Sequence, residues 1–174
     1  MREDPKVIRS KIVTSFITEF NDHGVNLNLD NVAKRIHISK KTIYRYFDSK
    51  SDIYIYVLKT TREYILQKQK EILEADNISL LEKLTRILTI KTPFEDYIDF
   101  SHIHELRTAE PEVYEEIRVG YSDQWEYFIC LIEEGKAKGI IRPSVNARLA
   151  AEGLSAAMTS FYKKDVLEQA HVTY

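Results

Sequence analysis

Apolar residues recur every three to four positions along nearly the whole chain, and this spacing predicts a protein made entirely of α-helices. The first apolar stripe is bounded by Asp4-Pro5, a favourable helix start, and by Gly24, a favourable helix end. Its members are Ile8, Ile12, Phe16 and Phe20. Asn28 can cap a second, short helix. The inward positions of that helix are Leu29, Val32, Ala33 and Ile36.

The next stretch, SKKTIYRYFDSK from Ser39 to Lys50, gives two conflicting indications. Its β-branched and aromatic residues favour a strand by local propensity. A strand would need a partner, and the neighbouring segments have only helical spacing. On a helix, Ile43 and Phe47 would meet at i, i+4 and face the first two helices. We therefore predict a third helix from Lys40 to Phe47, joined to the second by a very short turn, which is a helix-turn-helix arrangement.

A fourth, longer helix is predicted to follow directly. Ser49 is its expected cap, with Asp52 three residues further on as in a capping box. No Gly or Pro interrupts its apolar stripe for roughly two dozen residues. Such a helix is long enough to connect two bodies.

Helical spacing continues to the last strong helix, which is predicted to begin at Asn146, with breaks at Pro93 and Pro111. The expected fold class is therefore all-α. We expect a three-helix helix-turn-helix domain over residues 1–50, joined by the long helix to a helical domain over residues 51–174.

The net charge of −2 conceals an uneven distribution. Residues 1–50 hold ten Lys and Arg against six Asp and Glu, whereas residues 51–174 hold fifteen against twenty-one. This asymmetry suggests that the N-terminal part meets an anion, although solvated charges placed by chance remain an alternative. No apolar run approaches the roughly 18 residues of a membrane span and no secretory signal opens the chain, so we expect a cytoplasmic protein. The lone Cys130 is expected to be a small core residue.

The outer face of the predicted third helix carries hydrogen-bond donors. A helix-turn-helix places the N-terminal part of its second helix in the DNA major groove, where Lys and Thr can contact base edges and Tyr hydroxyls can contact phosphates. Lys50 lies in the first turn of the next helix, where the positive end of the helix dipole disfavours a cation. A DNA phosphate there would reverse the sign, and the alternative is an ordinary exposed lysine.

The run VAKRIHISKKTIYRYFDSK, from Val32 to Lys50, resembles the DNA-binding signature of the TetR family of transcriptional regulators, roughly I-A-x-x-x-G-V-S-x-G-T-L-Y-x-Y-F-x-S-K. The segment from Gly139 to Ala150 also resembles that family's entry into its dimerising helix, while residues 78–134 match only in being helical. The resemblance implies a homodimer that binds a palindromic operator, usually as a repressor, and leaves it when a small-molecule effector binds the C-terminal domain. The family's DNA contacts carry over to Lys40, Lys41, Thr42, Tyr44, Tyr46 and Lys50.

Three positions depart from the family pattern, and Arg45 is a further point of tension. His37 replaces the turn glycine and would need to tolerate a positive φ. Lys41 replaces a common glycine and adds charge to the groove face, and Leu29 stands where many members have a phosphate-binding threonine. Arg45 faces outward on the helical wheel, although the family does not usually use that position for base contacts.

The last strong helix carries an apolar stripe rich in small residues, which would let a second helix approach closely. We predict that this stripe is the dimer surface, with an ordinary monomer core as the alternative. Its members are Ala150, Gly153, Leu154, Ala157, Met158 and Phe161. The resemblance implies one further helix, and only residues 163–174 remain for it.

The effector site has the weakest signal in the sequence. Aromatic residues of the central helices are candidates for its lining, although aromatic stripes at helical spacing also form cores. The candidates are Phe94, Tyr97, Phe100, His102, Tyr121, Trp125 and Phe128. His102 and His104 point apart on a helix, so we predict no metal site there.

The chain has no nucleophile–base set and no Gly-rich phosphate loop, so we expect neither an enzyme nor a cofactor. Two hypotheses from different classes remain. The first is a ligand-responsive, DNA-binding transcriptional regulator. The second is a helical small-molecule-binding or enzymatic protein whose basic N-terminus is incidental, and affinity for DNA separates the two.

Overall fold

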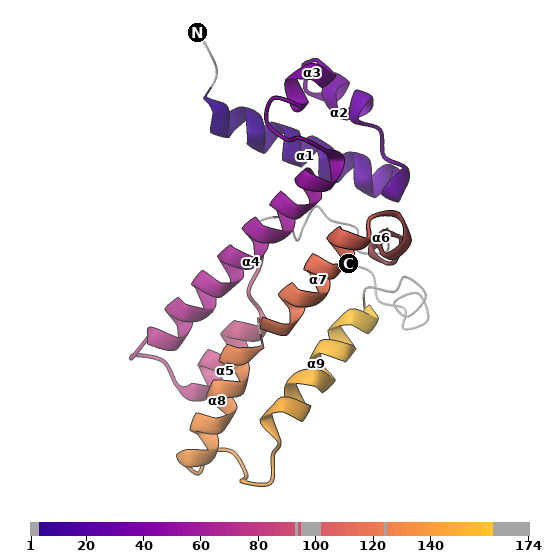
Figure 1. The fold of residues 1–174 in the computed structure, drawn as a ribbon. Helices are drawn as coiled ribbons and strands as arrows, with labels where there is room; N and C mark the ends of the chain where they lie inside the picture. Colours follow the sequence, from indigo (N-terminus) through magenta and orange to yellow (C-terminus); the bar gives the residue numbers. More distant parts are fainter. Residues whose placement is uncertain (1–3, 93, 95–101, 124, 162–174) are drawn as a thin grey trace. The chain divides into compact units, whose positions relative to one another are not determined.

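The computed structural model describes residues 4–92, 94, 102–123 and 125–161, and within this part of the chain it contains helices and no strand (Figure 1). The all-α prediction is confirmed. In chain order the elements are α1 (Pro5–His23), the 3-10 helix η1 (Gly24–Asn26), α2 (Leu29–Arg35), α3 (Lys40–Ile43), α4 (Lys50–Glu74), α5 (Leu80–Leu88), α6 (Ile103–Ala109), α7 (Pro111–Asp123), α8 (Glu126–Ala137) and α9 (Ala147–Phe161).

Helix α1 begins and ends where its sequence predicts. The Asp4 carboxylate accepts a hydrogen bond of 2.8 Å from the Lys6 amide, Pro5 occupies the first helical position, and Gly24 follows the helix with φ of 57°. Three of the four predicted stripe positions, Ile12, Phe16 and Phe20, are buried. Helix α1 therefore provides the apolar face against which the following helices pack.

The residues divide into two compact units, residues 1–60 with 94–117 and residues 61–93 with 118–174. This division differs from the boundary expected at residue 50, because the first turns of α4 bury Ile53, Tyr54 and Val57 in the core of the first unit. Leu106 of α6 and Val113 of α7 join the same core. The first unit is thus larger than three helices and includes a segment from the middle of the sequence.

The second unit has its own core, in which α8 packs against α5 and α9. The buried members are Ile87, Phe128, Leu131, Ile132, Ala147 and Ala151. Cys130 is exposed, so its prediction as a core residue was wrong. The buried positions of α8 define its inward side, and Cys130 falls on the other side of the helix. None of the described helices combines the length and the apolar character needed to cross a membrane.

Candidate nucleic-acid interface

The turn between α2 and α3 is closed by backbone hydrogen bonds around His37. The His37 amide donates to the Lys34 carbonyl at 3.2 Å and the Ile38 amide donates to the Ala33 carbonyl at 3.0 Å, which together form a Schellman motif. His37 has φ of 57°, in the left-handed region that usually favours glycine. The expectation that a histidine accepts a positive φ at this turn is confirmed.

Ser39 starts α3 as predicted. Its hydroxyl accepts from the Thr42 amide at 3.1 Å and lies 2.9 Å from the Thr42 hydroxyl. The helix is shorter than the expected Lys40–Phe47, because regular α-helix ends at Ile43 and the chain then tightens into i→i+3 bonds. Ile43 and Phe47 are both buried, so the inward half of the stretch is confirmed while its last turn is not α-helical.

The predicted outer face of α3 is accessible. Lys41, Tyr44 and Arg45 are exposed. Thr42 is half-buried, and its hydroxyl lies beside that of the capping Ser39. Lys40 forms an ion pair of 2.9 Å with Asp30 of α2, and this hydrogen bond raises the pKa of Lys40. Three donor side chains therefore face solvent from α3 and the turn that follows it, as a major-groove reader requires.

Arg9 of α1 holds the end of this stretch, which the sequence pattern did not reveal. Its guanidinium donates to the Tyr46 carbonyl at 3.0 Å and lies over the rings of Phe47, at 5.2 Å, and Tyr56, at 5.4 Å. The contact fixes the chain where the α3 helix has ended. The only indication of this contact in the sequence is that an arginine, Arg9, follows the apolar Ile8.

Glu19 ties α2 to α1 from inside the unit. Only 1% of its side chain is exposed, and it accepts from Asn31 at 2.7 Å and from Arg35 at 3.2 Å. Burial acts to raise the pKa of Glu19, but the bonds from Asn31 and Arg35 outweigh it, so the pKa lies below the ordinary value. The neighbouring Ser15 hydroxyl donates to the Val32 carbonyl at 3.0 Å.

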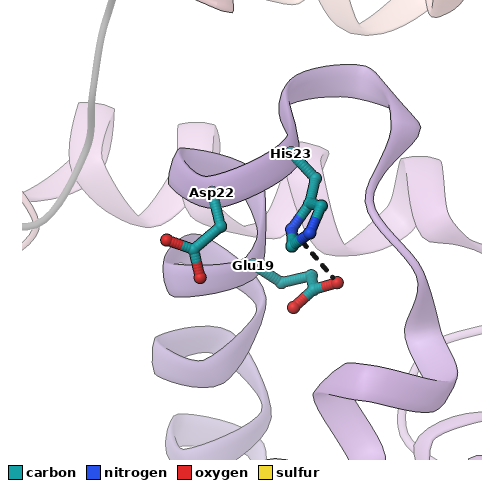
Figure 2. A group of neighbouring side chains, drawn as sticks. All are labelled: Glu19, Asp22 and His23. Atoms are coloured by element: carbon teal, nitrogen blue, oxygen red, sulfur yellow. Dashed lines mark ion pairs between the residues drawn. The ribbon is translucent and has the colours of Figure 1, made fainter.

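Glu19, Asp22 and His23 come close enough to resemble a metal-ligand cluster, with candidate ligand atoms within 4.8 Å of one another (Figure 2). The Arg35 guanidinium, however, lies 3.2 Å from both carboxylates. The counter-charge for the buried Glu19 is thus a cation of the chain itself. We interpret the cluster as part of the α1–α2 connection.

Lys50 has an anionic partner that the sequence did not reveal. Its ammonium lies 3.1 Å from Glu110 Oε1 and donates to the Val25 carbonyl at 3.0 Å. The same glutamate accepts from the Ser51 hydroxyl at 2.6 Å. The unfavourable cation in the first turn of α4 is therefore neutralised within the first unit.

The cap of α4 is as predicted, because the Ser49 hydroxyl accepts from the Asp52 amide at 3.0 Å.

Leu29, which stands in place of the family's threonine, is buried in the core of the first unit. It contributes packing where a hydroxyl would contribute a phosphate contact.

The described effector candidates fall in two different units. Phe94 and His102 belong to the first unit, where His102 packs edge-on against Phe20 with ring centroids 5.7 Å apart. Trp125 and Phe128 belong to the second, with ring centroids 5.6 Å apart. Tyr97, Phe100 and the side chain of Tyr121 lie outside the described residues. The effector site stays a prediction.

A surface hollow of about 440 Å³ lies in the second unit, between α8 and the segment that leads into α9. Its lining includes Glu133, Lys136 and Arg148 and none of the predicted aromatic residues. The hollow therefore gives the predicted effector site no support.

The predicted dimer stripe on α9 is divided between two sides of the helix. Ala150 and Leu154 pack against the core of the second unit, whereas Gly153 and Ala157 are exposed. A Cβ placed on Gly153 would meet nothing within 4 Å. The side chains of Met158 and Phe161, like residues 163–174, lie outside the described part of the chain.

The fold and the α2–turn–α3 geometry define a helix-turn-helix protein. Residues 17–57 match the family described as bacterial regulatory proteins, tetR family, so the predicted resemblance is confirmed. A curated relative, the uncharacterised HTH-type transcriptional regulator YvaF of Bacillus subtilis, is 21% identical over 68% of this chain and 63% of its own length. The chain thus spans less than two thirds of this relative.

Solved structures with the same fold include transcriptional regulators. FadR from Bacillus subtilis, crystallised in complex with stearoyl-CoA, matches with a TM-score of 0.69 and 18% identity over 94% of this chain and 89% of that chain. GusR from Salmonella enterica matches with a TM-score of 0.74 and 20% identity over 98% and 90%. At these identities the likeness establishes the fold across both units.

Proposed function

We propose that this protein is a ligand-responsive, DNA-binding transcriptional regulator that binds a palindromic operator as a homodimer and acts as a repressor. The observation that carries the proposal is the exposed donor face of α3, held in place by the Ser39 cap and the His37 turn. The match of residues 17–57 to the tetR family supports the same function. The alternative of an incidental basic N-terminus does not account for a complete helix-turn-helix.

The test is selection of duplexes from a randomised pool at moderate salt, followed by titration of the enriched sequence. A dimeric helix-turn-helix protein should enrich a palindrome with half-sites about one helical turn apart. Its affinity should fall steeply as salt is raised, because bound phosphates release counterions. If no palindrome is enriched, the proposed function is refuted.

Variants of the candidate contacts separate base from phosphate recognition. We propose that Lys41 and Thr42 contact bases, so Lys41→Ala and Thr42→Ala should change the preferred sequence. We propose that Lys50 contacts a phosphate, so Lys50→Ala should weaken all duplexes alike and reduce the salt slope by about one unit. Lys59→Ala, at an exposed position further along α4, is the matched control for charge. An unchanged salt slope in Lys50→Ala would remove the phosphate role.

The ligand response is tested by linkage. A ligand that lowers DNA affinity must itself bind more weakly to the DNA-bound protein, by the same factor. Because a structural relative was crystallised with stearoyl-CoA, a series of acyl-CoA thioesters is a reasonable first set of probes. Calorimetric titration with and without operator measures both halves of the cycle, and a factor of one, meaning equal ligand affinity in both states, would refute a response to these ligands.

The dimer is proposed to form through the exposed side of α9. Leu149 is 70% exposed there and lies one turn before Gly153. Leu149→Arg should therefore give a monomer in sedimentation velocity, with unchanged helix content, and should lose affinity for the palindrome. A dimer that survives this substitution would place the interface elsewhere.

A further inference from the structure

Two of the predicted DNA contacts, Lys40 and Lys50, already have an anionic partner in the protein, and the partner of Lys50 is the less exposed of the two. The Lys50 side chain is 28% exposed, and its ammonium already binds Glu110 and the Val25 carbonyl. The Glu110 side chain is only 15% exposed, so solvent screens this ion pair less than it screens a pair on the open surface. The ion pair lies wholly within the first unit.

The backbone around Glu110 is fixed at both sides. The Glu110 amide donates to the Leu106 carbonyl at 2.9 Å and its carbonyl accepts from the Tyr114 amide at 3.0 Å, so it joins the end of α6 to the start of α7. Its second carboxylate oxygen accepts from the Ser51 hydroxyl. The carboxylate is therefore aimed at the start of α4 by contacts on both helices.

Helix α6 is itself attached to η1, which follows α1. Glu105 Oε2 accepts from the Val25 amide at 3.3 Å, and Glu105 Oε1 lies 2.8 Å from His102 Nδ1. Val25 thus binds Glu105 through its amide and Lys50 through its carbonyl. The buried Leu106 adds apolar contact with the core. These contacts keep Glu110 beside Lys50 in the protein without DNA.

We propose that Glu110 competes with the DNA phosphate for Lys50, so that the α6–α7 junction holds DNA affinity below what the helix-turn-helix alone would give. This inference rests on the proposed DNA-binding function. A phosphate that approached while Glu110 stayed in place would meet a second anion a few ångströms away, and the two like charges repel. Full phosphate binding therefore requires the Lys50–Glu110 pair to open.

The experiment compares Glu110→Gln with wild type on the enriched palindrome. Gln keeps the shape and an oxygen for Ser51 but removes the charge that binds Lys50. Because the competing ion pair no longer has to open, Glu110→Gln should bind about three- to tenfold more tightly. Glu112→Gln, at an exposed position of α7, makes the same change in net charge and should alter affinity less than about twofold by long-range electrostatics alone.

A double-mutant cycle with Lys50 gives the decisive readout. In a Lys50→Ala background, Glu110→Gln should have no larger effect than Glu112→Gln, because the competing group is gone. The inference is overturned if Glu110→Gln weakens binding, if it matches Glu112→Gln, or if its gain persists without Lys50. If Lys50→Ala weakens DNA binding while Glu110→Gln leaves it unchanged, only the competition of Glu110 with the DNA phosphate is refuted. Failure of the wild type to enrich any duplex would refute the proposed function together with it.

Discussion

The Glu19→Gln substitution is the most direct test of what holds α2 against α1. Glu19 is almost fully buried, and its carboxylate accepts one charge-assisted bond from Arg35 and a further bond from Asn31. Gln keeps one acceptor oxygen but loses the charge that Arg35 binds. Hydrogen bonds to charged groups contribute about 1.5–3 kcal/mol, so the connection between α1 and α2 should lose roughly 2 kcal/mol.

Asp22→Asn is the matched control, since Asp22 lies at the same 3.2 Å from the same guanidinium. Its side chain is 51% exposed, so solvent screens the pair and the expected loss is below about 0.5 kcal/mol. Native-state hydrogen exchange of the α2 amides, such as those of Val32 and Ala33, measures the free energy of opening this helix in each variant. Equal protection in the two variants would refute the assignment of the stabilisation to the buried carboxylate.

Comparison of wild type with Glu19→Gln also predicts how the opening free energy of α2 depends on pH. The pKa of Glu19 is lower in the folded protein than its ordinary value, so its carboxylate contributes stability above the ordinary value. That contribution is lost as the pH falls through the lowered folded pKa. The difference in opening free energy between wild type and Glu19→Gln should therefore be full at neutral pH and should shrink as the solution becomes acidic. A difference that stays constant to the acid limit of folding would contradict this account.

Three further substitutions test local geometry. His37→Gly should raise the thermal midpoint, because it relieves a left-handed residue that costs about 1 kcal/mol, and His37→Ala, which keeps that cost, should not. Gly24→Ala should destabilise the first unit by about 1–3 kcal/mol in denaturant titration, because φ is 57° and the new Cβ would lie 2.5 Å from Glu105 Oε2. Tyr54→Phe should leave stability equal or slightly higher, since the buried hydroxyl has no hydrogen-bond partner among the described residues; a loss above about 1 kcal/mol would show that it has one.

Sequence patterns predicted where α1, α2, α3 and α4 begin because each of these helix starts has a local chemical cause. Asp4, Asn28, Ser39 and Ser49 all cap the helices assigned to them, since a side-chain oxygen near its own backbone amides acts over two or three residues. The inward position of Ile43 followed from its spacing to Phe47. Signals of this kind are complete within a short stretch of chain.

The partners of charged residues could not be predicted in the same way. Lys50 and Glu110 are sixty positions apart, and no periodicity connects them. Periodicity also cannot say which side of α9 faces the unit's own core, so one predicted stripe held both Leu154, which packs inward, and Gly153, which is exposed. Contacts of these kinds depend on tertiary packing, which single-sequence patterns do not contain.

The conflict between strand and helix in the stretch around α3 now has a physical explanation. Regular helix lasts only from Lys40 to Ile43, and so short a helix has no stability of its own in water. It is held by the buried Ile43 and Phe47 and by the bond from Arg9 to the Tyr46 carbonyl. Tertiary contacts, and not local propensity, therefore maintain this helix. We expect that substitutions in α1 that weaken these contacts lower DNA affinity even where they touch no DNA. Arg9→Lys should do so through lost ring contacts, since an ammonium cannot reproduce a planar guanidinium over two aromatic rings while it binds that carbonyl.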